Sequence, residues 1–290
     1  MKIKKLINKS YYGTQGYISS IKDLDNLERY IELNLDILKE YVNIIVATNF
    51  SNLDKGLPEL NKELWCKYFP NAIILDSPTN RGHNHGYCDL ENILVEYCVD
   101  NNIEWLCKSA NDTILTKDIF NIPLPKKEVD CYYQLHFNKE TTETFKLSQS
   151  KMEENWFSIQ GSLYFINTSK VTKGWHDKKY LDKTYDYIQK LDNYNGKIWE
   201  YIPEFECELM IASNVKRNNL TKHYIFSGKL YQTLWNLIRT YSIHDPSHKN
   251  LLIQGISHLH FPLQKVALIN LKKELKPNPE MNKPTIHSAF

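Results

Sequence analysis

Hydrophobic and polar positions along the first 110 residues follow two alternating patterns. Apolar residues recur at helical spacing over 22–41, whereas unbroken apolar runs at 43–50 and 72–76 are typical of buried parallel strands. In chain order the patterns predict a strand at 2–7, an extended piece at 17–20, a helix at 22–41, a strand at 43–50, a helix at 57–69, a strand at 72–76, a loop at 77–86, a helix at 87–101 and a strand at 104–108.

This alternation predicts a parallel sheet whose strands are joined by crossover helices. Ligands of such sheets bind outside the carboxyl ends of the strands. Polar clusters follow three of the predicted strands, at Thr48-Asn49, at 76–86 and at Asn111-Asp112. We therefore expect these clusters to converge on one crevice.

The second half of the chain shows a less regular pattern. It predicts strands at 129–137 and 158–167, a polar loop at 141–154, helices at 178–191, 206–218 and 231–240, an extended segment at 255–262 and a basic amphipathic stretch at 266–275. No internal repeat or linker divides the chain. We expect one domain over 1–265, with a first half at about 1–120 and a second half at about 121–265. A basic, proline-containing tail over 266–290 follows it.

Composition narrows the function classes. The 290 residues are 42% hydrophobic and carry a formal net charge of +2, with only four arginines among 36 basic residues, which argues against nucleic-acid binding. No apolar run is long enough to cross a membrane, and the amino-terminal residues lack the features of a secretory signal. The six cysteines form no C-x-x-C pair, so we expect reduced thiols and a cytoplasmic protein.

Two motifs carry a family resemblance. Asn80-Arg81-Gly82 precedes a predicted helix, and Asn111-Asp112-Thr113 follows the next predicted strand, 30 residues after Gly82. This arrangement resembles the nucleotide-sugar-dependent glycosyltransferases of the GT-A fold, in particular the family-2-like members. The resemblance implies an α/β fold: a GT-A-like Rossmann-type sandwich with a mostly parallel central sheet flanked by helices. It also implies that the first half, about 1–120, is the donor half and that the second, about 121–265, is the acceptor half.

The resemblance also implies a metal site, although the acidic motif is incomplete. The family motif offers two carboxylates, whereas this chain has only Asp112. One carboxylate is enough to hold Mn²⁺ or Mg²⁺ against a diphosphate, and His258, in a segment that resembles the late histidine segment of the family, is the second expected ligand. A metal-independent enzyme that neutralises the diphosphate with Lys108 or Arg81 is the alternative.

A carboxylate near residue 208 is the expected catalytic base. Residues 206–210 resemble the family element in which the second acid removes the proton of the acceptor hydroxyl. On that register Glu208 is the base, and Glu206 is held in reserve. The expected donor-binding residues are Thr48, Asn49, Asp76, Asn80, Arg81, Gly82, Lys108 and Asn111.

These features predict a metal-assisted, inverting glycosyltransferase of the hexosyltransferase type. Its partners would be a nucleoside-diphosphate sugar and a glycan or glycoconjugate acceptor. Weak peripheral association of the basic tail with a membrane also stays open. Two other functions stay open: a metal-dependent hydrolase, or an inactive carbohydrate- or nucleotide-sugar-binding protein. The hydrolase would draw its ligands from His83, His85, Asp112, His258 and His260.

Each motif also has a purely structural interpretation. Asp112 and Thr113 are good helix caps, and the acids at 206 and 208 suit a helix amino terminus or a solvated face. His258 and His260 fit a hydrogen-bonded core equally well.

Overall fold

The computed structural model describes residues 2–50, 56–111, 113–115, 119–120, 122, 124–138, 157–194, 198, 201–202, 205, 207–226 and 258–260. Its helices are α1 (Lys4–Ile7), α2 (Ile21–Leu38), α3 (Leu57–Tyr68), α4 (Gly82–Asp100), the 3-10 helix η4 (Thr168–Lys170), α6 (Lys178–Ile188) and α7 (Cys207–Arg217). Its strands are β1 (Tyr11–Ile18), β2 (Ile44–Phe50), β3 (Ile73–Asp76), β4 (Trp105–Ala110), β5 (Thr113–Leu115), β6 (Cys131–Asn138), β7 (Phe157–Asn167), β8 (Lys222–Phe226) and β9 (His258–His260).

Seven of these strands form one mixed sheet in the order β3-β2-β1-β4-β7-β6-β8. Within this described sheet only β7 runs against the others, because it pairs antiparallel with both β4 and β6. The first four strands run parallel, and helices connect β1 to β2, β2 to β3 and β3 to β4. The predicted α/β sandwich, with a mostly parallel central sheet flanked by helices, is therefore confirmed.

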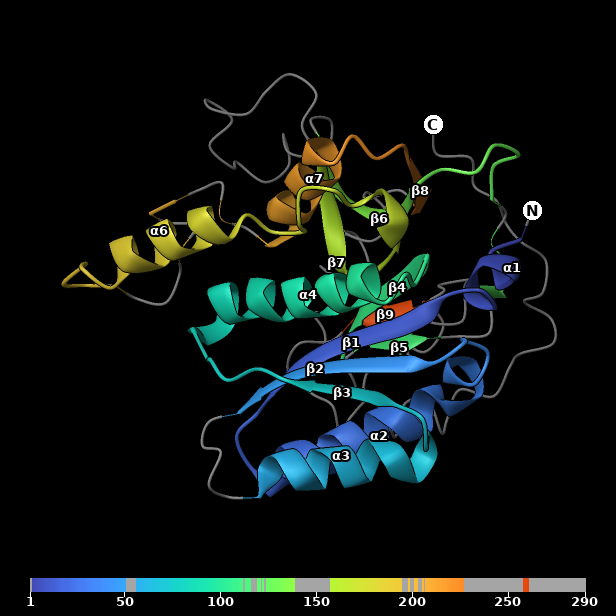
Figure 1. The fold of residues 1–290 in the computed structure, drawn as a ribbon, viewed down its shortest axis with the longest axis horizontal. Helices are drawn as coiled ribbons and strands as arrows, with labels where there is room; N and C mark the ends of the chain where they lie inside the picture. Colours follow the sequence, from blue (N-terminus) through green and yellow to red (C-terminus); the bar gives the residue numbers. More distant parts are fainter. Residues whose placement is uncertain are drawn as a thin grey trace, which may run out of the picture.

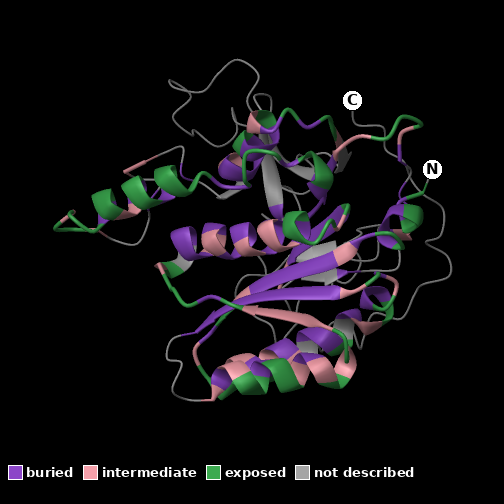
Figure 2. Ribbon diagram, in the orientation of Figure 1, coloured by how far each residue is buried: buried purple, intermediate pink, exposed green. Residues whose placement is uncertain are grey.

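Helices cover both faces of the sheet (Figure 1). The face of α2 and α3 holds one apolar cluster, which includes Tyr12, Val46 and Trp65. The face of α4 and α7 holds a second, which includes Ala47 and Leu94. Figure 2 shows the buried strands between these layers, and alternation along each strand decides which cluster a residue joins.

The amino-terminal region differs from the prediction. Residues 2–7 are not a strand: residues 4–7 form α1, a single turn that buries Leu6 and Ile7. The first strand is instead β1, of which the predicted extended piece at 17–20 covers only the end. Two glycines interrupt the β-forming residues of Tyr11–Ile18, which hid the strand.

Helix α4 begins earlier than predicted. The expected loop over 77–86 ends at Arg81, because Gly82 already belongs to the helix. Gly82 has φ +80°, a left-handed conformation that favours glycine and turns the chain into α4. The last five residues of the expected loop therefore form the first turns of the helix.

In the second half the strands at 129–137 and 158–167 and the helices at 178–191 and 206–218 are confirmed within a few residues. Strands β5 and β8 were missed. The segments 141–154, 231–240 and 266–290 lie outside the described residues. None of the described helices is long and apolar enough to span a membrane.

A second, two-stranded sheet joins distant parts of the chain. Strand β5 pairs antiparallel with β9, so that Thr113 lies opposite His260 and Leu115 lies opposite His258. The predicted extended segment at 255–262 thus contains a strand, and it returns to the end of β4.

Candidate functional site

Four parallel strands end at the same edge of the sheet. Thr48 of β2 pairs with Asp76 of β3 on one side and with Gly16 of β1 on the other. Gln15 pairs with Ala110 of β4, so Asn111 follows at the level of Gly16. The polar strand ends therefore lie at one edge of the sheet, while their convergence on one crevice stays a prediction.

Strand alternation divides these residues between two faces of the sheet. Thr48 faces α3, where its hydroxyl accepts a hydrogen bond from Asn61 Nδ2 at 3.3 Å. Asp76 lies on the same side, where burial and the neighbouring Glu59 raise the pKa of its carboxyl. Asn111 also belongs to this side, since its amide lies against Gly16 and leaves no room for a side chain there.

On the α4 face, two buried side-chain amides lie at the ends of neighbouring strands. Asn49 of β2 is 3% exposed and its Oδ1 has no hydrogen-bond partner. Gln15 of β1 is 5% exposed; its Nε2 donates to Tyr87 O at 3.1 Å, but its Oε1 has no partner. Unsatisfied buried oxygens are costly, and a ligand that supplies N–H or O–H donors would relieve this cost.

Asn49 lies beside the amino end of α4. A Cβ atom added at Gly86, in the second turn of the helix, would be 3.2 Å from Asn49 Nδ2 and 3.7 Å from Asn80 Oδ1. Asn80 itself accepts the backbone N–H of Gly82 at 3.0 Å. The amino end of a helix attracts anions through its free N–H groups and its dipole. Donors of the helix and acceptors of the amides thus meet in one place.

Arg81 lies at the start of α4 and is held by two carboxylates. Its Nε and Nη2 donate to both oxygens of Asp89 at 2.7 and 2.5 Å, and its Nη1 donates to Asp182 of α6 at 2.7 Å. The hydrogen bonds that Arg81 donates to Asp89, followed by the one to Asp182, raise the pKa of the guanidinium, despite partial burial. Arg81 therefore stays a fixed cation at the edge of the site.

Next to it, His85 is buried between α4 and α6. Its Nε2 lies 3.0 Å from the hydroxyl of Thr184, and its ring contacts Tyr185 and Phe205. Burial and then the charge of Arg81 lower the pKa of His85 to about 4. His85 was expected in an exposed loop; instead it is a neutral group in an aromatic cluster.

Lys108 lies inside the molecule, below the candidate site. Its side chain is fully buried, and its Nζ lies 2.9 Å from Glu91 Oε1. The ammonium also donates to Gly161 O at 2.8 Å and to the hydroxyl of Tyr87. Lys108 was predicted to bind the donor, but its ammonium group makes these bonds inside the protein, and its role there is structural.

Glu91 receives four donors and connects both halves of the protein. Besides Lys108, the hydroxyl of Tyr164 donates to it at 3.0 Å, Trp175 Nε1 at 3.3 Å and His176 Nε2 at 2.7 Å. We call these five residues the Glu91 cluster. Burial raises the pKa of Glu91, but Lys108 and His176 outweigh it and lower the pKa to about 2.

The remaining predicted residues are placed only in part. Asp112 and Glu206 lie outside the described residues. Glu208 belongs to the first turn of α7, and His258 is the first residue of β9; only their backbone positions are described. Within the described part of the chain, no three side chains form a group that could hold a metal ion.

Three residues of this region were missed by the sequence reasoning. Gln15 belongs to a strand that the hydrophobic pattern did not show. Glu91 lies within the helical pattern of 87–101, and its position among apolar residues was the available signal of burial. Asp182 carries no sequence signal, because its partner Arg81 is 101 residues away.

No protein-family model and no curated protein matches the sequence. Solved structures similar to it include an active-site mutant of LgtC, with a TM-score of 0.49 and 9% identity, covering 94% of this chain and 99% of that one. Galactosyltransferase LgtC in complex with donor and acceptor sugar analogs matches with a TM-score of 0.47 and 9% identity, covering 93% and 98%.

A nucleoside-diphosphate-sugar pyrophosphorylase from Vibrio cholerae matches with a TM-score of 0.39 and 12% identity, covering 75% of this chain and 92% of that one. All three TM-scores are below 0.5. The function of this chain must therefore be derived from its own residues.

Proposed function

We propose that the protein is a glycosyltransferase that moves a sugar from a nucleoside diphosphate to a hydroxyl group of a glycan or glycoconjugate. The observation that carries the proposal is the buried, unpartnered oxygen of Asn49 beside the amino end of α4. It combines an acceptor for the N–H or O–H groups of a nucleoside with a site for its diphosphate.

Donor binding would use both faces of the strand edge. Asn49 and Gln15 would accept hydrogen bonds from the base or the ribose. The first backbone N–H groups of α4 would bind the diphosphate. Gly82 and Asn80 shape the turn that leads the chain into this helix. Arg81 would add a positive charge beside it. Asp76 and Asn111, on the other face, would contact the outer part of the donor.

Asp112 and His258 are the proposed ligands of Mn²⁺ or Mg²⁺. The pairing of β5 with β9 brings the backbone of the late histidine segment next to the residues that follow Asp112, with His260 opposite Thr113 and His258 opposite Leu115. Carboxylate and imidazole form a donor set that suits Mn²⁺ better than Mg²⁺, which prefers oxygen ligands. When bound, the metal would neutralise the charge of the departing diphosphate.

Glu208 is the proposed base for the acceptor hydroxyl, with Glu206 as the reserve. It would take the hydroxyl proton while the oxygen forms a bond to the anomeric carbon and the bond to the diphosphate breaks. Attack opposite the leaving group inverts the anomeric carbon. The first turn of α7 begins close to α4, since Met210 Sδ lies 4.0 Å from Cys88 Sγ.

Saturation-transfer NMR with nucleoside diphosphates and their sugars, with and without Mn²⁺, tests donor binding. Transfer to an acceptor array then tests the wild type against Asp112→Asn and Glu208→Gln. We expect donor binding in all three, with transfer reduced in both variants. Absence of binding by any nucleotide sugar would refute the proposal, and full transfer by both variants would refute the site.

A metal-dependent hydrolase receives no support from His85, which is buried against Phe205 and Tyr185. A binding protein without catalysis remains the competing proposal. In that case the wild type would bind the donor but transfer sugar to no acceptor of the array.

A further inference from the structure

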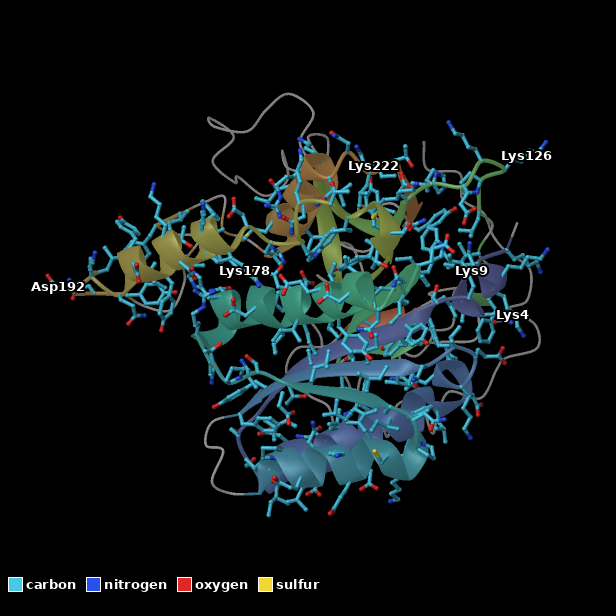
Figure 3. The ribbon with its side chains drawn as sticks, in the orientation of Figure 1. Lys4, Lys9, Lys126, Lys178, Asp192 and Lys222 are labelled. Atoms are coloured by element: carbon cyan, nitrogen blue, oxygen red, sulfur yellow. The ribbon has the colours of Figure 1, made fainter. Side chains whose placement is uncertain are left out.

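Helix α6 forms an arm along the candidate site. It begins at Lys178, and the arm ends near Asp192, which lies farthest from the sheet in Figure 3. Lys178 pairs with Glu96 of α4 at 2.9 Å, and Asp182 pairs with Arg81 at the other end of α4. Helix α6 thus runs antiparallel to α4 and extends past its amino end (Figure 1).

The two carboxylates on Arg81 differ in their surroundings. Asp89 is on the same helix as Arg81, makes two of its hydrogen bonds and has a side chain that is 16% exposed. Asp182 is on the arm, makes one hydrogen bond and is 68% exposed. Bidentate, shielded pairs are strong, whereas exposed single contacts contribute little. Asp182 is therefore the exchangeable partner.

Charge gives a reason for this exchange. One guanidinium and two carboxylates sum to a charge of −1, and Arg81 itself precedes the first residue of α4, at the helix end that lies beside the unpartnered Asn49. An anionic ligand binding there would be repelled by Asp182, and it would compete with Asp182 for Nη1 of Arg81. Replacing one anion by another on the same N–H leaves the hydrogen bonding of Arg81 unchanged.

We propose that Asp182 holds the place of a phosphate oxygen on Arg81, so that binding of the donor diphosphate displaces Asp182 and loosens the arm. This inference rests on the proposed function, because it takes the diphosphate as the ligand. The contact of His85 with Thr184 and the ring contacts of His85 keep α6 attached after the exchange. The donor thereby controls how tightly the arm is held against α4.

Inorganic pyrophosphate is the probe, with affinity measured by calorimetry and mobility of residues 178–188 by hydrogen exchange. In the wild type, pyrophosphate is expected to speed exchange in α6. Asp182→Asn should bind pyrophosphate about 5- to 10-fold more tightly. In this variant α6 should already exchange fast and respond little to the ligand. Asp186→Asn is the matched control, because it removes the same charge from an exposed position of α6.

Equal gains in affinity from Asp182→Asn and Asp186→Asn would overturn the proposal, since a general charge effect would then explain both. Absence of any response of α6 in the wild type at saturating pyrophosphate would also overturn it. Because pyrophosphate needs no sugar, base or turnover, the exchange can be verified even if sugar transfer fails. Conversely, if the protein transfers sugar but Asp182→Asn binds pyrophosphate no more tightly than the wild type, only the exchange is refuted.

Discussion

Lys108 of β4 and Glu91 of α4 form an ion pair at 2.9 Å with both side chains fully buried. Around it lie Tyr164 of β7 and the segment of Trp175 and His176, which precedes α6. His176 Nδ1 in turn lies 2.9 Å from the amide of Asn214 in α7. When that amide donates, Nε2 of the histidine carries its proton and donates to Glu91. One carboxylate thereby ties the parallel strands to the second half.

Substitution Lys108→Met should destabilise the protein strongly. It leaves the charge of Glu91 buried without its cation, which costs about 3 to 5 kcal/mol. Urea denaturation followed by circular dichroism measures the loss. The exposed pair of Lys67 and Glu28, at 2.6 Å, provides the control. Lys67→Met should change the midpoint far less, and similar losses from both variants would contradict this role for the buried pair.

Stability should fall as the pH falls from about 6.5 to about 4, partly because of His85. Its pKa in the folded protein is about 4, against 6.5 for an unperturbed histidine, so between these values the unfolded chain binds more protons. This effect is absent above pH 6.5. Denaturant titrations at pH 7, 5.5 and 4.5 should show a smaller loss in His85→Gln than in the wild type. An equal loss in both proteins would contradict it.

Gly161→Ala should destabilise the protein, because the added methyl group would clash with the hydroxyl oxygen of Tyr87. A Cβ at this position would lie 2.6 Å from the hydroxyl oxygen of Tyr87, which is held by Lys108. Such overpacking typically costs about 1 to 3 kcal/mol. A double-mutant cycle with Tyr87→Phe measures the clash. The double variant should lose less than the sum of the two single variants, and strict additivity would show that the clash is relieved elsewhere.

Asn49→Ala should weaken binding of nucleoside diphosphates about tenfold, or ~1.4 kcal/mol, without a comparable loss of stability. The reason is that Asn49 Oδ1 has no partner in the folded protein. Thr48→Val is the matched control at the next residue. Its hydroxyl bonds Asn61 on the other face of the sheet, so this variant should lower the melting temperature and leave ligand affinity unchanged. A reversed outcome would assign the nucleoside contact to Thr48 and not to Asn49.

The sequence pattern was sufficient where apolar runs were long. The unbroken apolar runs at 43–50 and 72–76 predicted β2 and β3. Strand β2 is buried throughout, whereas β3, at the edge of the sheet, is only half-buried. Because both strands were placed, the pattern also put Thr48 and Asp76 at the same edge of the sheet, where they pair. Strand β1 was misplaced because Gly13 and Gly16 interrupt its pattern, and Gln15 was lost with it.

Side-chain partners were beyond the reach of the pattern. Lys108 looked like a cation at a strand end that a ligand could reach. Alternation along β4 instead turns its side chain inward, where it contacts Glu91 of the neighbouring helix α4. Arg81 looked available to a ligand, although Asp182, 101 residues later, binds it. Such pairs depend on tertiary packing, which spacing along one segment does not encode.

The pairing of β5 with β9 also has a consequence for the order of assembly. The seven strands of the large sheet end at Phe226, so this sheet can form while the chain is still being synthesised from its amino end. Thr113 must then wait for residues 258–260, about 145 positions later in translation. Among the described residues, the proposed metal site is thus the last part to be completed, after the large sheet has formed.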